Sequence, residues 1–369
     1  MSNTSDGSSQ HDRWTHLAVV VSGWPRLSES FALNELLALR DAGMLAAVFA
    51  TKRGDIGERH PAAALLDSSV HFLADATIDQ QADEISRVLG DQRIDGIHGY
   101  FAHQPAAVAQ AAATRLGVPF GFSAHAKDPG KVDPAELAAR ARAAACIVAC
   151  NAQVAEQLRA VGADPILVPH GVDLTYFAPA EHIGGDRIEL LAVGRLVAKK
   201  GFDVLIDSVG LLDFDWRLRI VGDGPLLLQL HDQARQTVDA HRINFVGART
   251  HAELPSLYHE ADIVVVPSVI DTAGDQDGLP NVVLEAMACG LAIVGSDVAA
   301  IPAAIEHRVT GLLVDPGDRH GLANAVSELA KDVDLRAALG ANARARVESQ
   351  FGLSACTSRF LSILEDAYG

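Results

Sequence analysis

Residues 188–201 read IELLAVGRLVAKKG, and this stretch decides the fold. The first six residues are apolar except for Glu189, a composition typical of a buried parallel strand. A turn at Gly194 follows, and two cations, Arg195 and Lys200, lie between this turn and the next helical pattern. A strand that leads through a glycine turn into a helix is the repeating unit of a doubly wound α/β sheet.

The same alternation of strand and helix extends in both directions from this stretch. Before it, strands are expected at 16–22, 45–51, 70–73, 94–98, 118–123, 147–150 and 166–168, with the clearest helices at 29–42, 104–116 and 151–161. After it, strands are expected at 188–193, 218–221, 243–246, 263–266, 292–295 and 312–314. Such alternation predicts right-handed crossovers and parallel sheets.

The chain length of 369 residues suits two domains rather than one. The segment 173–186 contains Pro179 and Gly184-Gly185, which interrupt the alternation and indicate a linker. We therefore expect two Rossmann-like parallel-sheet domains that face each other across a cleft. Their expected bounds are 14–178 and 186–352, after a disordered tail at 1–13 and before a last helix at 353–369 that packs back on the first domain.

The composition argues against several classes of protein. A net charge of −17, spread along the chain, disfavours a nucleic-acid partner and a large basic membrane patch. The four cysteines have no histidines at zinc-site spacing, so buried thiols are expected. We find no apolar core of a signal peptide and no run of about 18 apolar residues for a membrane helix, which favours a soluble, cytoplasmic protein.

Residues 277–290, DGLPNVVLEAMACG, place two carboxylates eight positions apart. Pro280 suits the first position of a helix. The N–H groups of Gly278 and Leu279 would then lie at a positive helix end, suited to an anion or a sugar hydroxyl. Asp277 would stand beside that end, with Glu285 about two turns down the helix. The alternative is an ordinary surface loop before a helix.

Other expected strand ends carry polar residues as well. Arg195 and Lys200 could clamp a diphosphate, although solvated surface charge is an alternative. The glycine turn at Gly222 permits close backbone approach, and Arg249 follows the next strand. Because carboxyl ends of parallel strands share one edge of a sheet, these residues are expected to converge.

These motifs together resemble the retaining glycosyltransferases of family four, which have the two-domain B-type fold. The resemblance lies in GRLVAKKGFDVLIDSV, IVGDGP, FVGARTHAELPSLYHEADIVVVPS, DGLPNVVLEAMACG and TGLLVDPGD, which cover residues 188–318 in the family's order. In the first half, GWPRLSESF with Asn34-Glu35, and FSAHAKD at 122–128, resemble the colanic-acid and exopolysaccharide branch.

The resemblance implies a role for each matching residue. Arg195 and Lys200 would hold the donor diphosphate, and Glu285 would bind the ribose hydroxyls. Asp277, with the N–H groups of Gly278 and Leu279, would hold the transferred sugar. His125 matches the family's active-site histidine. Independently of the resemblance, Gly222 and Arg249 are candidates for the donor site, with a simple turn and an exposed arginine as the alternatives. The loops of the first domain offer acceptor-side candidates at Trp24, Arg26, Glu29, Tyr100 and His103.

One departure from the family concerns the first acid, which is usually glutamate and here is Asp277, one methylene shorter. The sugar specificity of better-known members is therefore not transferred. Asp275 lies close by and could share the role. Asp213-Phe214-Asp215 has the spacing of a metal clamp but precedes an expected strand, on the wrong edge of the sheet. Neither a metal nor another cofactor is expected.

The predicted activity is metal-independent, retaining transfer of a hexose from a UDP- or GDP-sugar to a saccharide hydroxyl. The leading acceptor is a lipid-linked saccharide in cell-surface polysaccharide synthesis, which is compatible with weak peripheral membrane association. A small soluble acceptor, a same-fold epimerase or phosphorylase, and a non-catalytic binding protein are the alternatives. An oxidoreductase is disfavoured because Gly23-Trp24-Pro25-Arg26 lacks the Gly-x-Gly-x-x-Gly of a dinucleotide site.

Overall fold

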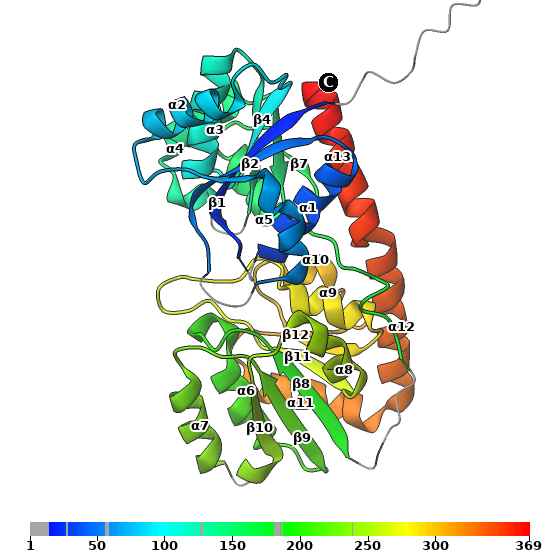
Figure 1. Ribbon diagram of the computed structural model, residues 1–369. Coiled ribbons are helices and arrows are strands. Elements are labelled where there is room, and N and C mark those ends of the chain that lie inside the picture. Colours follow the sequence, from blue (N-terminus) through cyan, green and yellow to red (C-terminus); the bar gives the residue numbers. More distant parts are fainter. Residues whose placement is uncertain are drawn as a thin grey trace, which may run out of the picture. The chain divides into compact units, whose positions relative to one another are not determined.

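The computed structural model describes residues 15–26, 29–55, 59–125, 128–180, 185, 187–237 and 239–369. The expected tail at 1–13 lies outside these residues. The contacts divide the chain into two compact units, each with its own parallel sheet (Figure 1). Unit 1 comprises Met1–Cys150, Val154–Val168 and Thr357–Gly369, and unit 2 comprises Asn151–Gln153 and Pro169–Cys356.

Unit 1 contains a seven-stranded sheet of order β3-β2-β1-β4-β5-β6-β7, in which each assigned pairing is parallel. The strands are β1 (Leu17–Trp24), β2 (Leu45–Arg53), β3 (Val70–Phe72), β4 (Gly96–Tyr100), β5 (Phe120–Ala124), β6 (Cys146–Ala149) and β7 (Ile166–Leu167). The helices are α1 (Ser30–Asp41), α2 (Ile78–Leu89), α3 (Gln104–Leu116), α4 (Pro134–Ala143) and α5 (Ala152–Arg159), and α13 (Leu353–Tyr368) returns to this unit.

The sheet of unit 1 is covered on both faces. Side chains of α2, α3, α4 and α5 form one apolar cluster with it, and side chains of α1 and α13 form the other. The returning helix is fixed by Tyr368, whose hydroxyl lies 3.0 Å from Nδ1 of the buried His98 on β4. Fully covered strands explain why this half of the sequence reads as nearly continuous apolar runs.

Unit 2 contains a six-stranded sheet of order β10-β9-β8-β11-β12-β13. The strands are β8 (Ile188–Val193), β9 (Trp216–Val221), β10 (Ile243–Gly247), β11 (Ile263–Val266), β12 (Ala292–Ser296) and β13 (Leu312–Val314). The helices are α6 (Phe202–Val209), α7 (Leu227–Gln236), α8 (Leu254–His259), α9 (Asn281–Ala288), α10 (Ile301–Ala304), α11 (Arg319–Lys331) and α12 (Val333–Gln350).

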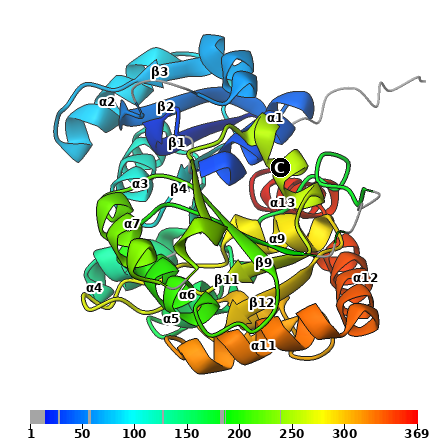
Figure 2. The same cartoon turned by 90° about the horizontal axis from the view of Figure 1, so that it is seen from below.

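The helices of unit 2 also form two layers. The side chains of α6, α7 and α11 pack on one face of the sheet, and those of α8, α9, α10 and α12 pack on the other. Figure 2 shows β11 and β12 between α9 and α11. In each unit the strand order reverses beside the first strand, between β1 and β4 or between β8 and β11. Ligands of open α/β sheets bind at such switch points.

The predicted fold class is confirmed, as each expected strand is present within a few residues of its predicted position. The expected linker near residue 180 differs from the observed division, which falls between Val168 and Pro169. The reason is packing, because Phe177 is buried in the apolar cluster of unit 2 and the hydroxyl of Tyr176 donates to the carbonyl of His251. Pro179 and the two glycines of this segment therefore indicate irregular backbone, and they do not mark the boundary between the two units.

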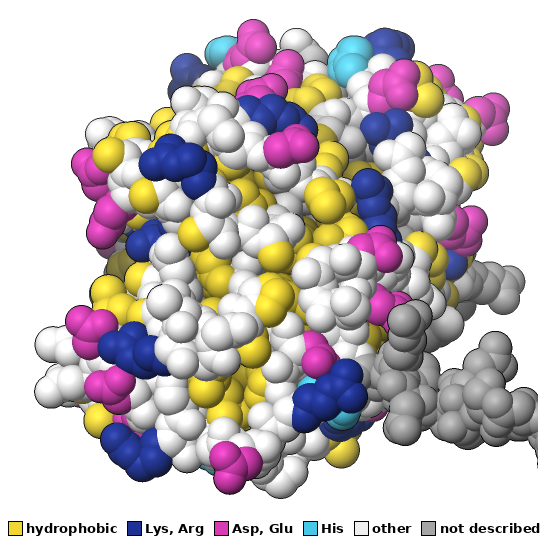
Figure 3. Space-filling view, turned by 90° about the horizontal axis from the view of Figure 1, so that it is seen from above, with side chains coloured by type: hydrophobic (Ala, Val, Ile, Leu, Met, Phe, Trp, Pro, Cys, Tyr) yellow, Lys and Arg dark blue, Asp and Glu magenta, His cyan; other side chains and the backbone are white. Residues whose placement is uncertain are grey.

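The surface bears both signs of charge. On the face in Figure 3, Lys and Arg side chains lie dispersed among Asp and Glu. Within the described residues, each of the four cysteines is a buried free thiol, as expected. Among the helices of the described part of the chain, none combines the length and apolarity that crossing a membrane requires.

Candidate active site

The carboxyl edge of the unit 2 sheet is built by close backbone approach. Gly222 follows β9 with φ of 145°, and a Cβ there would lie 1.9 Å from the carbonyl oxygen of Gly194. The N–H of Gly194 in turn donates to the carbonyl of Val221. The turns after β8 and β9 therefore nest against each other, which holds the Gly194-Arg195 turn in place. Gly222, which was predicted to be a donor-side residue, thus packs against the turn that carries Arg195.

Lys200 and Asp277 form an ion pair at this edge. The Nζ of Lys200 lies 2.7 Å from Oδ2 of Asp277, and both side chains are mostly buried. The aliphatic part of Lys200 lies against the turn after β8, since a Cβ on Gly194 would be 3.4 Å from its Cε. The Asp277 carboxylate also accepts a hydrogen bond from the Ser268 hydroxyl at 3.3 Å. Lys200, predicted to hold the donor diphosphate, and Asp277, predicted to hold the transferred sugar, are therefore neighbours.

Lys199 provides a second cation beside the same carboxylates. Its Nζ lies 3.3 Å from Oδ2 of Asp275 and 3.5 Å from Oδ1 of Asp277. Asp275, named as an alternative to Asp277, is thus paired with a different lysine and is the more exposed of the two acids. This arrangement favours Asp277 as the acid that lies with Lys200.

Helix α9 begins one residue later than predicted. Pro280 has an extended ψ of 133° and occupies the N-cap, so the helix starts at Asn281. Glu285 is therefore little more than one turn, not two, from the helix start. The N–H groups of Gly278 and Leu279 donate to no residue in the described part of the chain. These donors precede the helix and remain suited to a hydroxyl or an anion.

Glu285 is buried and has one notable partner. The hydroxyl of Tyr258 on α8 donates to its Oε2 at 2.7 Å. Burial raises the pKa of Glu285 to about 7, and the Tyr258 hydrogen bond opposes this increase. A carboxylate whose charge is costly because it is buried gains from each further hydrogen-bond donor that reaches it.

We expect Tyr258→Phe to weaken nucleotide-sugar binding several-fold at pH 7 and much less at pH 9. Loss of the hydroxyl removes a donor that stabilises the carboxylate, so the pKa of Glu285 increases and the charged form needs a higher pH. Titration calorimetry at both pH values measures the change. A loss that is equal at pH 7 and pH 9 would contradict the coupling.

The two predicted arginines of unit 2 differ in position. The side chain of Arg195 directly follows the turn after β8, is exposed, and forms no hydrogen bond or ion pair with the described residues. Arg249 follows β10, the outer strand of the sheet, and lies 3.7 Å from Glu253. Arg195 is therefore placed at the switch point with Lys200, whereas Arg249 lies two strands away.

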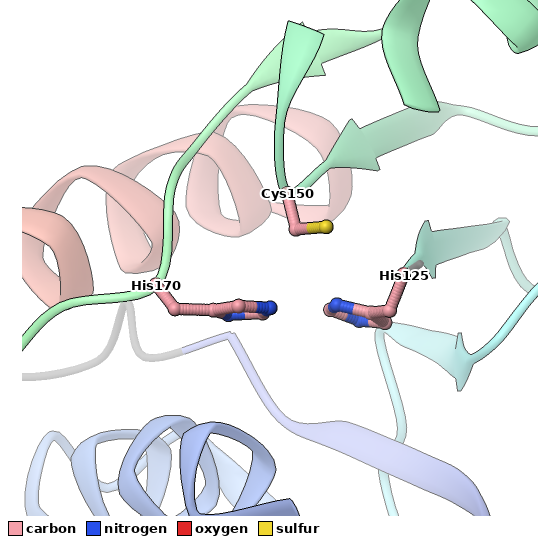
Figure 4. Close-up of side chains that lie close together, drawn as sticks. All are labelled: His125, Cys150 and His170. Carbon is pink, nitrogen blue, oxygen red and sulfur yellow. The ribbon is translucent and has the colours of Figure 1, made fainter. Parts of the chain in front are cut away.

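In unit 1, His125 directly follows β5 and is buried. Its ring lies 4.6 Å from that of Phe31 and stacks with that of Tyr100 at 5.8 Å. Figure 4 shows His125 and Cys150 extending from the ends of the neighbouring strands β5 and β6. The third labelled residue, His170, belongs to unit 2. Aromatic packing thus fixes the orientation of the imidazole.

Asp128 links the loops that follow β4 and β5. Its buried carboxylate accepts the backbone N–H groups of Ala102, His103 and His125 at 2.5, 3.2 and 3.4 Å. Burial raises the pKa of Asp128 to about 7, and these hydrogen bonds lower it. Ala126 and Lys127 of the same motif lie outside the described residues. Asp128 therefore connects the backbone of His125 to the loop after β4.

The acceptor-side candidates fall into two groups. Arg26 and Glu29 form an ion pair of 3.2 Å, and His103 caps α3 through Nδ1. Burial, with nearby Lys131, lowers the pKa of His103 to about 4, so its imidazole is neutral at pH 7. Tyr100 is enclosed in the core, where its hydroxyl donates to Glu35 at 2.6 Å. Trp24, at the end of β1, is also buried.

Sequence reasoning did not identify Tyr258, Asp128 or Lys199 as members of the site. Asp128 was quoted within a motif, but nothing in its spacing revealed the three backbone donors. Tyr258 lies on a helix before β11, and its contact with Glu285 depends on the packing of α8 against α9. Lys199 stands beside Lys200, and only Lys200 was named as a donor-site residue.

Models of two protein families match the chain. The model described as glycosyl transferases group 1 matches residues 187–332, and the model of glycosyltransferase family 4 matches residues 28–176. These ranges correspond to most of unit 2 and to much of unit 1. The order of the two matches along the chain is that of the two parallel sheets.

Two curated relatives come from polysaccharide biosynthesis. The amylovoran biosynthesis glycosyltransferase AmsK of Erwinia amylovora is 34% identical over 182 residues, covering 48% of this chain and 44% of the relative. The putative colanic acid biosynthesis glycosyltransferase WcaL of Salmonella typhimurium is 31% identical over 219 residues, covering 57% and 54%. The chain spans about half the length of these relatives.

Solved structures share the fold over nearly the whole chain. Anabaena Alr3699/HepE in complex with UDP has a TM-score of 0.82 at 19% identity, covering 95% of this chain and 100% of that one. A glycosyltransferase from Rickettsia africae has a TM-score of 0.80 at 16% identity, covering 96% and 98%. At these identities the similarity is one of fold.

Proposed function

Because the chain belongs to the family-four glycosyltransferases, we propose that it transfers a hexose from a nucleotide diphosphate sugar to a saccharide hydroxyl with retention of configuration. The observation that carries this proposal is the Lys200–Asp277 pair of 2.7 Å beside the exposed Arg195 at the switch point of unit 2. Two cations next to an acid suit a ligand with phosphates at one end and hydroxyls at the other.

The division of labour follows from the chemistry of each group. Arg195 and Lys200 stabilise the negative charge that develops on the diphosphate as the glycosidic bond breaks. Glu285 accepts hydrogen bonds from the ribose, while Asp277 and the free N–H groups of Gly278 and Leu279 hold hydroxyls of the hexose. His125, oriented by its aromatic neighbours, acts on the transferred sugar.

The donor base is uracil or guanine in this proposal. One structural neighbour is a complex with UDP-glucose, and one relative is named as a GDP-mannose-dependent mannosyltransferase acting on a phosphatidylinositol monomannoside. The names of the polysaccharide-biosynthesis relatives support a saccharide acceptor, with a lipid-linked one as the leading candidate. A thermal-shift screen of UDP- and GDP-sugars identifies the donor, because a bound ligand raises the apparent stability.

The reaction itself is tested by the configuration of its product. With the donor identified, NMR of the new glycosidic linkage should show the α configuration of an α-linked donor, and turnover should be unchanged by a chelator. Retention is expected because leaving-group charge and acceptor attack share one face of the sugar. An inverted product excludes the proposed mechanism, and loss of activity with chelator excludes metal independence.

A further inference from the structure

A pocket in unit 1 lies where three neighbouring strands end. The last residues of β1, β2 and β3 are Trp24, Arg53 and Phe72, and each of them lines it. Trp24 and Arg53 are direct partners in the register of the sheet. The cavity volume is about 370 Å³, within the range of small-molecule sites. We call it the β1–β3 pocket.

The walls of this pocket are held by backbone and by an ion pair. The N–H of Gly54 donates to the carbonyl of Trp24, and that of Asp55 donates to the carbonyl of Pro25. The guanidinium of Arg59 donates to both carboxylate oxygens of Asp67 at 2.9 and 2.8 Å. The two segments after β1 and β2 are thereby joined, and the charge of Arg59 is already compensated.

One cation of the pocket, the exposed Arg53, has no charged partner within the described residues. The guanidinium of Arg53 lies 4.8 Å above the ring of Phe72 and makes no hydrogen bond or ion pair within the described residues. The indole N–H of Trp24 is buried and likewise has no partner among the described residues. A stacked arginine keeps the edge of its fork available for a planar anion.

We propose that the β1–β3 pocket binds an acidic sugar residue of the acceptor. The carboxylate or phosphate of this residue lies on the guanidinium of Arg53, at the end of β2. The identification of this ligand as part of the acceptor rests on the proposed glycosyltransfer. The binding of an acidic sugar involves residues of unit 1 alone.

The binding test uses the full chain without nucleotide. Saturation-transfer NMR and calorimetry compare methyl glucuronide and glucose 6-phosphate with the neutral methyl glucoside. We expect at least one of the two anions to bind ten-fold or more tightly than the neutral glycoside, because a bidentate charged hydrogen bond is lost with the charge. The better anion identifies the substituent. Equal binding of the three probes overturns the proposal.

Variants connect this preference to the pocket. Arg53→Gln should weaken the preferred anion ten-fold or more and change the neutral glycoside less than two-fold. Trp24→Phe keeps an aromatic ring and removes only an N–H that is buried away from the pocket, so it should change anion binding less than two-fold. The control is Arg93→Gln. Arg93 is an exposed arginine that precedes β4 and therefore lies at the amino ends of the strands, so its replacement should leave binding unchanged. Wild-type anion affinity in Arg53→Gln overturns the proposal.

A separate measurement distinguishes this inference from the proposed function. Nucleotide-sugar binding should be the same in Arg53→Gln as in the wild type, because Arg53 belongs to unit 1 and the donor groups named above belong to unit 2. If the wild type binds no nucleotide sugar, the proposed function fails while the anion preference is still measured. Lost donor binding in Arg53→Gln together with retained anion binding overturns the acceptor assignment.

Discussion

Lys200→Ala should lower kcat by about a hundred- to a thousand-fold, the range found when one preorganised donor is removed from a developing charge. The ammonium of Lys200 is 2.7 Å from Asp277 and its side chain is largely buried, so it cannot be replaced by solvent without loss. The donor affinity should fall less than kcat, since the charge on the diphosphate grows as the bond breaks. Steady-state kinetics with the identified donor measure both quantities.

The neighbouring lysine supplies a matched control for this experiment. Lys199→Ala removes the same charge one residue away, from a more exposed side chain whose distances to Asp275 and Asp277 are 3.3 and 3.5 Å. We expect its kcat to fall less than about five-fold, as befits a partly exposed ion pair. Equal losses in the two variants would mean that general positive charge, rather than the position of Lys200, matters.

The sequence predicted the fold well because burial on both faces makes parallel strands nearly continuous apolar runs. The run at 263–266 and the strand β11 coincide, and the last helix was expected within one residue of each observed end. The start of α9 was misplaced by one residue because proline usually occupies the first helical position, whereas the extended ψ of Pro280 places it at the N-cap.

The sequence predicted those site residues that follow the end of a strand. Arg195 and Lys200 were identified because cations followed a strand, and the same signal at Lys52-Arg53-Gly54-Asp55 was overlooked. Partners that depend on helix packing could not be found in this way. Tyr258 and Glu285 are 27 positions apart, and their contact requires the side chains of α8 and α9 to meet over β11.

The pKa of Glu285 connects its stability with its role in binding. Burial raises this pKa from 4.5 to about 7, so the folded protein retains a proton that the unfolded chain releases in that interval. The stabilising contribution of the protonated carboxyl is complete below pH 4.5 and is lost as the pH rises through about 7. A neutral glutamine has no such loss. Ionised Glu285 therefore weakens the fold in the pH range where it binds ribose best.

Glu285→Gln should for this reason change two quantities in opposite directions. Its free energy of unfolding, relative to the wild type, should increase by about 3 kcal/mol between pH 4.5 and pH 8, an order-of-magnitude figure from the shift in pKa. At pH 8 its nucleotide-sugar affinity should fall about a hundred-fold, because two hydrogen bonds to a charged acceptor are lost. Denaturant unfolding and calorimetry on the same samples measure both.

Asp213→Asn is the control, because its pKa shift has the opposite direction. Lys331 donates to this exposed carboxylate and holds its pKa below the usual value, so the wild type gains stability as the pH rises. The relative stability of this variant should decrease with pH, and its donor affinity should not change.

If Glu285→Gln binds nucleotide sugar as the wild type does at pH 8, Glu285 is a core residue and the ribose assignment is wrong. If affinity falls without the pH-dependent gain in stability, the carboxylate is already compensated in the free protein.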